Sequence, residues 1–270
     1  MFRQKINVVT IDAFSPGAVE SLTAEIRTGE VALIWFEYIQ GQTGKRLPGE
    51  LIEVIKKSQK IQGYYIGVDE ILMGMYRSGT FFSYAGTGLS PDIVTLSKGL
   101  SYMSFPTGAT LVNSRVYESA LETCSKTVQW LQSRYINSLG AHIALHCLNR
   151  LEREDIGANV ESSSAALQAG LDALIARGGL IEKAETTGLM MHLSYRTPWW
   201  IRMLGKSGRM AYLLLLTRFW LKQDVFVFLD SRIAPSLCLS ADEVDTFLQK
   251  AERIAATTPL KIVLDGILKK

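Results

Sequence analysis

The chain has 270 residues, of which 47% are hydrophobic, and its formal net charge is +3. Its length allows a sizeable core in one large domain or two small ones. The charge is too small, and the basic residues too scattered, to indicate a nucleic-acid partner. Phe2 to Ile6 holds two basic residues with no long apolar stretch after it, so we expect no signal peptide and a cytoplasmic location.

Cysteine usage and hydropathy add two expectations. Cys124, Cys147 and Cys238 show no close spacing and are predicted to be reduced core thiols. The apolar segment 199–229 is interrupted before any run reaches about 18 residues, which argues against a membrane span. The interrupting basic residues are Arg202, Lys206, Arg209, Arg218 and Lys222. A buried amphipathic helix or a partner surface is favoured there, with interfacial membrane contact as the minor alternative.

The first part of the chain alternates predicted strands and helices. Residues 31–36 form a continuous apolar run typical of a buried parallel strand. Pro48-Gly49 then begins a helix over 50–62, which Gly63 ends. Further strands are predicted at 64–68, 93–96 and 109–112. Repeated β-α units of this kind indicate an α/β fold with a mainly parallel sheet.

Two long helices follow. The first has an apolar stripe at spacing four: Leu139, Ile143, Cys147 and Leu151. The second is lined by Val160, Leu167, Leu171 and Leu174. The charged stretch 151–157 ends in glycine, so we place a boundary there, with a partial large domain over 1–156 and a small domain over 157–270.

The remainder predicts a small α+β domain. Strands are expected at 188–194, 225–229 and 232–239. Ser240 and Glu243 have the spacing of a capping box, in which each side chain bonds the backbone amide of the other. The final helix then buries Val244, Phe247, Leu248, Ala251 and Ile254.

Asp69 and Lys98 are the candidate functional pair. Each closes an apolar run, and open parallel sheets place ligands at the carboxyl edge of their strands. An unprotonated lysine amine is a nucleophile that forms an imine with an aldehyde. Taken singly, a lysine after a strand is usually a solvated surface residue, and an Asp-Glu pair usually starts a helix.

The ordered set of motifs around this pair is more specific. Lys98 follows Asp69 by 29 residues (98 − 69). The pieces are Asp69-Glu70-Ile71, Gly74, Arg77-Ser78-Gly79, Pro91-Asp92-Ile93, Lys98-Gly99 and Phe105-Pro106-Thr107-Gly108-Ala109. They resemble the core of the class III aminotransferases, and the resemblance extends over about residues 32–255. It implies fold type I of the pyridoxal-phosphate transferases and the cofactor pyridoxal 5'-phosphate.

Several roles are implied by the resemblance alone. Lys98 would carry the cofactor as an imine, and Asp69 would hold its pyridinium nitrogen protonated. Ile71 would pack on one face of the ring. Ser133 stands where the family has a threonine that donates to the cofactor phosphate of the neighbouring subunit. Arg232 resembles the arginine that grips a substrate carboxylate, with a structural ion pair as its alternative.

The chain also departs from the family pattern. Gln42 stands where some members have a glutamate that neutralises the substrate arginine, so Arg232 is expected to be unmasked. Leu72 replaces a glutamine that can bond the cofactor's phenolic oxygen, and residues 100–104 are bulkier than usual. Tyr38 replaces a proline. The expected substrate is a small amine or amino acid.

The glycine-rich cup for the cofactor phosphate, which family members have upstream, is not in this sequence. We therefore expect a split enzyme in which a partner chain supplies the cup, with two copies of each chain in a heterotetramer. One alternative is a catalytically silent binding or assembly module. Another is a different reaction on the same scaffold, such as racemisation, decarboxylation or amino-group migration.

His142 and His146 are a competing site, because residues four apart share one helix face. No glutamate stands between them in the protease pattern, and His192 is the only other histidine. Structural histidines are favoured, and no metal is expected.

Overall fold

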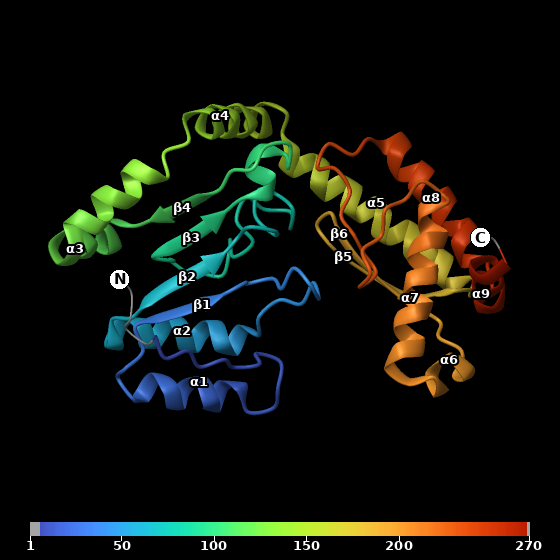
Figure 1. The fold of residues 1–270 in the computed structure, drawn as a ribbon, viewed down its shortest axis with the longest axis horizontal. Coiled ribbons are helices and arrows are strands. Elements are labelled where there is room, and N and C mark those ends of the chain that lie inside the picture. The colour runs from blue at the N-terminus through green and yellow to red at the C-terminus, as the bar shows by residue number, and fades with distance from the viewer. Residues whose placement is uncertain (1–5, 269–270) are drawn as a thin grey trace.

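The computed structural model describes residues 6–268, which form two sheets and their helices (Figure 1). The first sheet has the strand order β1-β2-β3-β4. Its strands are β1 (Leu33–Phe36), β2 (Tyr65–Asp69), β3 (Ile93–Leu96) and β4 (Ala109–Val112). The first three are parallel and β4 runs antiparallel to β3. All four predicted strands are confirmed within two residues at their ends.

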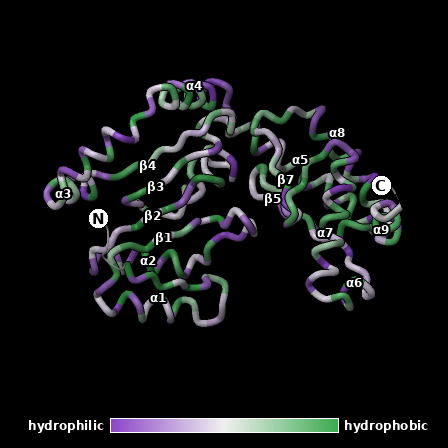
Figure 2. The backbone as a smooth tube through the Cα atoms, in the orientation of Figure 1, coloured by the Kyte–Doolittle hydropathy of each residue, from purple (hydrophilic) through white to green (hydrophobic). Residues whose placement is uncertain are grey.

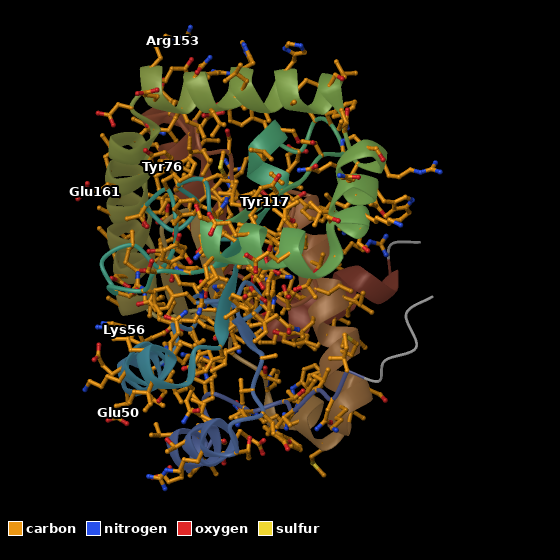
Figure 3. The ribbon with its side chains drawn as sticks, turned by 90° about the vertical axis from the view of Figure 1, so that its left-hand side faces the viewer. Glu50, Lys56, Tyr76, Tyr117, Arg153 and Glu161 are labelled. Atoms are coloured by element: carbon orange, nitrogen blue, oxygen red, sulfur yellow. The ribbon has the colours of Figure 1, made fainter. Side chains whose placement is uncertain are left out.

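One face of the first sheet is covered by α1 (Ala18–Arg27) and α2 (Gly49–Gln62). Ile55 of α2 packs against Ile66 and Val68 of β2 in one buried cluster. The opposite face leaves apolar side chains open to solvent, because Leu33 and Trp35 of β1 are 43% and 45% exposed. Figure 3 shows Glu50 and Lys56 on the side of α2 that faces away from the sheet. Helix α2 confirms the prediction, whereas α1 was not predicted.

The next helices lead from the first sheet to the second. They are η1 (Lys98–Ser101), α3 (Ser114–Arg134), α4 (Ser138–Arg153) and α5 (Ile156–Ala176). Helix α3 was not predicted, and none of its residues is buried. The stripe predicted for α4 is confirmed in part, since Cys147 and Leu151 are buried but Leu139 is 59% exposed. The stripe predicted for α5 is confirmed, because all four of its residues are buried. Tyr76, which follows β2, lies beside Gly157 of α5, in the interior seen in Figure 3.

The second sheet is antiparallel, in the order β5-β6-β7. Its strands are β5 (Ile181–Thr187), β6 (Met190–Tyr195) and β7 (Arg232–Ile233). Strand β5 was not predicted. The strand predicted at 225–229 is wrong, because this apolar run is a loop that turns back so that Phe228 N donates to Arg232 O. The strand predicted at 232–239 shrinks to two residues.

Four helices complete the fold. They are α6 (Trp199–Met203), α7 (Gly205–Leu221), α8 (Ala241–Ala255) and α9 (Pro259–Leu268). For the apolar segment 199–229, a buried amphipathic helix was favoured. That helix is α7, whose Tyr212, Leu216 and Trp220 are buried. The capping box of α8 is confirmed, with Glu243 N donating to Ser240 Oγ. Helix α9 was not predicted. None of the described helices is long and apolar enough to cross a membrane.

The largest buried cluster joins the two predicted domains. It contains Leu96 and Leu151 from one side of the predicted boundary, together with Leu167 and Trp220 from the other. The division at 156/157 stays a prediction. All three cysteines are free thiols, as expected. The expectation that all three lie in the core is wrong, because only Cys147 is buried. Cys124 is exposed on α3, and Cys238 is exposed in the loop before α8.

Candidate functional site

Asp69 and Lys98 lie at the same edge of the first sheet. Asp69 is the last residue of β2, and Lys98 begins η1 directly after β3. The two strands are parallel neighbours, and Asp69 is in register with Thr95, three residues before Lys98 (98 − 95). The expectation from sequence that both groups reach one edge is therefore met by the geometry. Their chemical roles stay predictions.

The immediate surroundings of the pair leave both groups available. Asp69 Oδ1 accepts a hydrogen bond from Ile71 N at 2.8 Å, and no described residue bonds its other carboxylate oxygen. Lys98 is exposed, and its amine has no hydrogen bond or ion pair with residues 6–268. The backbone φ of Lys98 is 42°, in the left-handed region that residues other than glycine rarely adopt. Ser97 Oγ helps to hold this turn by donating to Thr107 O at 2.8 Å.

Glu70, next to Asp69, was not predicted to be part of the site. It is buried and accepts from both Ser83 N and Ser83 Oγ, at 2.9 and 2.5 Å. Burial raises the pKa of Glu70, and the two bonds from Ser83 oppose that rise. Glu70 thus ties the loop after β2 to the strand that ends in Asp69. No local pattern reveals this contact, because its partner is thirteen residues away.

Arg232 of β7 reaches across to the post-β1 loop, which we define as residues 37–46. Its Nη1 donates to Gly41 O at 2.8 Å, and its guanidinium lies over the Phe228 ring at 5.1 Å. Its Nε lies 2.7 Å from Asp230 Oδ2. The expectation that Arg232 is unmasked is therefore wrong. The turn at Ser231, with φ 67°, brings both charged side chains together.

Gln42 enters the site through its backbone. Its carbonyl oxygen lies 3.2 Å from His192 Nε2, and since a carbonyl only accepts, Nε2 is the protonated nitrogen. His192 is in register with Arg232, so two neighbouring strands hold two successive carbonyls of the post-β1 loop. Burial lowers the pKa of His192, and the bond to Gln42 opposes the shift. A substrate role for the Gln42 side chain stays a prediction.

Arg77 makes a second connection that was not predicted. Its Nη1 donates to Leu189 O at 3.0 Å and to Pro235 O at 2.6 Å, on the turn between β5 and β6 and on the loop after β7. Burial lowers the pKa of Arg77 to about 10, so it stays protonated at neutral pH. The only sequence signal for Arg77 was the Arg77-Ser78-Gly79 motif. This motif does not indicate that the partners of Arg77 are backbone carbonyls.

The other candidate residues lie on α3 and α4. Ser133 of α3 is exposed, and its Oγ donates to Trp130 O at 2.9 Å. Its contact with a neighbouring subunit stays a prediction. His142 and His146 are exposed on α4. Within residues 6–268, no group of three or more His, Cys, Asp or Glu side chains is placed to hold a metal ion.

The fold is that of known transaminases. A solved N-acetylornithine aminotransferase from Stenotrophomonas maltophilia K279a superposes with a TM-score of 0.69 at 24% identity, over 94% of this chain and 65% of that chain. An S-selective transaminase from Bacillus megaterium gives 0.70 at 22% identity, over 88% and 54%. Together with the strand-end pair, this defines fold type I of the pyridoxal-phosphate enzymes.

The sequence comparison gives the family. Residues 10–254 match the model of the class-III aminotransferases, so the chain belongs to this family, whose cofactor is pyridoxal 5'-phosphate. It is 36% identical to acetylornithine aminotransferase of Xylella fastidiosa over 64% of this chain and 41% of the relative. For the same enzyme of Vibrio parahaemolyticus the identity is 25%, over 88% and 56%. The chain thus spans about half the length of these relatives.

The residues present fit the ring end of this cofactor. Beside Asp69, the hydroxyl of Thr95 is buried without a hydrogen-bond partner among the described residues. A buried polar atom without a partner is costly, so this strand end is suited to a polar ligand. Asp69 and Lys98 would provide the carboxylate and amine that the ring and aldehyde of the cofactor require. Ile71 is half-buried beside them.

Proposed function

We propose that this chain is the subunit of a split aminotransferase that supplies the covalent and ring-binding groups. The observation that carries the proposal is that Asp69 and Lys98 lie at the carboxyl ends of two adjacent parallel strands. Lys98 would hold the cofactor through its aldehyde group and would move the substrate proton. The free oxygen of Asp69 stabilises a positive charge on the ring nitrogen. When bound, the cofactor supplies an electron-accepting ring.

A partner chain completes the site in this proposal. It supplies the phosphate cup and covers the face of the first sheet on which Leu33 and Trp35 are exposed. An assembly with two copies of each chain follows from the family resemblance, because Ser133 would then reach a neighbouring cofactor phosphate.

The substrate in this proposal is a small amine or amino acid. The relatives named above are acetylornithine aminotransferases, and Arg232 is a cation suited to a donor carboxylate. The silent assembly module is the second candidate. Its support is Leu72, which packs with Ile39 and Met190 and fills the space beside Gly41. A racemase, decarboxylase or aminomutase would use the same Lys98 and Asp69.

Borohydride reduction of the assembled complex tests the role of Lys98. With pyridoxal phosphate present, we expect mass spectrometry to find the reduced adduct on Lys98 and on no other lysine of this chain. Lys98→Ala should lose it. Asp69→Asn should keep the adduct but slow the half-reaction with an amino donor, because the ring nitrogen loses its charge partner. An adduct on another lysine, or none in the complex, contradicts the assignment.

Expression with and without the partner tests the split-enzyme proposal. The chain alone should aggregate or bind the cofactor poorly, because the apolar face of the first sheet is open. Co-expression with a chain that carries the class III phosphate cup should give a soluble yellow complex. A well-behaved monomer with full transaminase activity would show that no partner is needed, whatever the outcome for Lys98.

A further inference from the structure

Helix α6 and the first turns of α7 form a projecting tip, which we define as residues 199–210. In Figure 1 the tip lies beyond the second sheet, at the lower right. Ile201 is buried and anchors α6 to the rest of the structure. Trp200 is half-buried and packs against the large core cluster. Four other large apolar side chains of the tip are open to solvent: Trp199 is 72% exposed, Met203 77%, Leu204 62% and Met210 52%. One exposed apolar residue is ordinary, but four in so short a segment mark an interaction surface.

The same tip carries only positive charge. Arg202, Lys206 and Arg209 are exposed, and none forms an ion pair with a described residue. Arg202 Nε instead donates to the Thr197 carbonyl at 3.0 Å. No aspartate or glutamate occurs between Glu185 and Asp224. A surface with exposed cations and no neighbouring carboxylate is complementary to an anionic ligand.

We propose that this tip binds an anionic lipid bilayer surface. Trp199, Met203 and Leu204 would enter the headgroup level, while Lys206 and Arg209 contact lipid phosphates. The interleaving of basic and apolar residues along α6 and the start of α7 favours this ligand, because a bilayer surface accepts both at one depth (Figure 2). Tryptophan also suits a membrane interface, where one end of its ring system is apolar and the other wet. The tip is separate from Asp69 and Lys98.

Vesicle flotation with the full chain in its purified assembly tests the proposal. We expect binding to vesicles of phosphatidylglycerol with phosphatidylcholine and none to phosphatidylcholine alone. The charge variant Lys206→Glu with Arg209→Glu should lower the partition coefficient at least about tenfold. The apolar variant Trp199→Ser with Met203→Ser should lower it by a similar factor. The matched control is Lys60→Glu with Ile61→Ser on α2, where Ile61 is 82% exposed, and it should bind as the unaltered chain does.

Tryptophan fluorescence gives a second readout. The emission should shift to shorter wavelength on phosphatidylglycerol vesicles, and Trp199→Phe should remove that shift. Three outcomes overturn the proposal: no binding to anionic vesicles, equal losses in the α2 control, or binding that depends on charge but not on Trp199 and Met203. The third outcome would show that the tip is attracted to anionic surfaces by charge alone and that its apolar side chains do not enter the bilayer.

Discussion

At the scale of single residues, the guanidinium of Arg232 is already engaged on two sides. Asp230 holds its Nε and the Gly41 carbonyl holds its Nη1. A substrate carboxylate that binds Arg232 must therefore approach the remaining N–H groups and compete with Asp230 for the charge. Under the proposed function, Asp230 would therefore set how strongly carboxylate-bearing donors are preferred over simple amines.

Variants at both positions test this competition. Arg232→Ala should weaken binding of a donor such as glutamate at least about tenfold, because a bidentate charge contact is lost. Asp230→Asn should strengthen the binding of the same donor. Half-reaction kinetics with glutamate and with an amine that lacks a carboxylate separate the effects, and Glu118→Gln on α3 is the control. Equal losses for both donors in Arg232→Ala would show that Arg232 is structural.

The sequence predicted the site residues that a strand end places, and it missed those that are held by hydrogen bonds to backbone carbonyls. The placement of Asp69 and Lys98 was predictable, because a strand end determines where a side chain reaches the edge of a parallel sheet. Arg77 and His192 were missed because they bond backbone carbonyls, which leave no mark on residue type. Asp230 is close to Arg232 in the sequence, but the ion pair between them depends on the left-handed turn at Ser231.

At the scale of elements, prediction succeeded where one face is buried along the whole element. Helix α8 and the apolar runs of β2 and β3 are of this kind. Helix α3 has no buried residue and so no stripe to detect. Strand β5 buries only Ile181 and Ala184, and the register shift between Ile181 and Lys183 breaks the period of two.

The turn between β5 and β6 offers a stability test. Gly188 has φ 56°, and a Cβ there would lie 2.2 Å from the Arg77 carbonyl oxygen. Gly188→Ala should therefore lower the free energy of unfolding by about 3 kcal/mol. Gly178 has φ 73° with nothing within 4 Å of such a Cβ, so Gly178→Ala should cost only about 1 kcal/mol of backbone strain. Urea unfolding measures both, and equal losses would mean that the contact with Arg77 contributes nothing.

At the scale of the whole molecule, two connections join the first sheet and its loops to the second sheet. His192 and Arg232 hold the post-β1 loop, and Arg77 holds the segments before β6 and after β7. The strand ends with Asp69 and Lys98 belong to the first sheet, whereas Arg232 belongs to the second. The distance between Lys98 and Arg232 therefore depends on these connections.

The burial of His192 makes stability depend on pH. Its folded pKa is lowered, so the unfolded chain takes up a proton first as the pH falls below about 6.5. The stabilisation is complete above that pH and is lost as the pH falls through the folded pKa. His192→Gln should flatten this part of the profile of unfolding free energy against pH, while His146→Gln on exposed α4 should not. Identical profiles for the unaltered chain and His192→Gln would contradict the assignment.

The acceptors of Arg77, His192 and Arg232 have a consequence for how such a site can diversify. The four acceptors are main-chain oxygens, of Leu189, Pro235, Gln42 and Gly41, and every amino acid has one. Side chains at positions 42 and 235 can therefore be exchanged while the relative placement of the two sheets is kept, whereas Leu189 is also fixed by its burial in the core. Position 41 is tied to another residue, because a Cβ there would lie 2.2 Å from Leu72 Cδ2. A related chain with a larger residue at 41 should carry a smaller one at 72, and the two positions should change together.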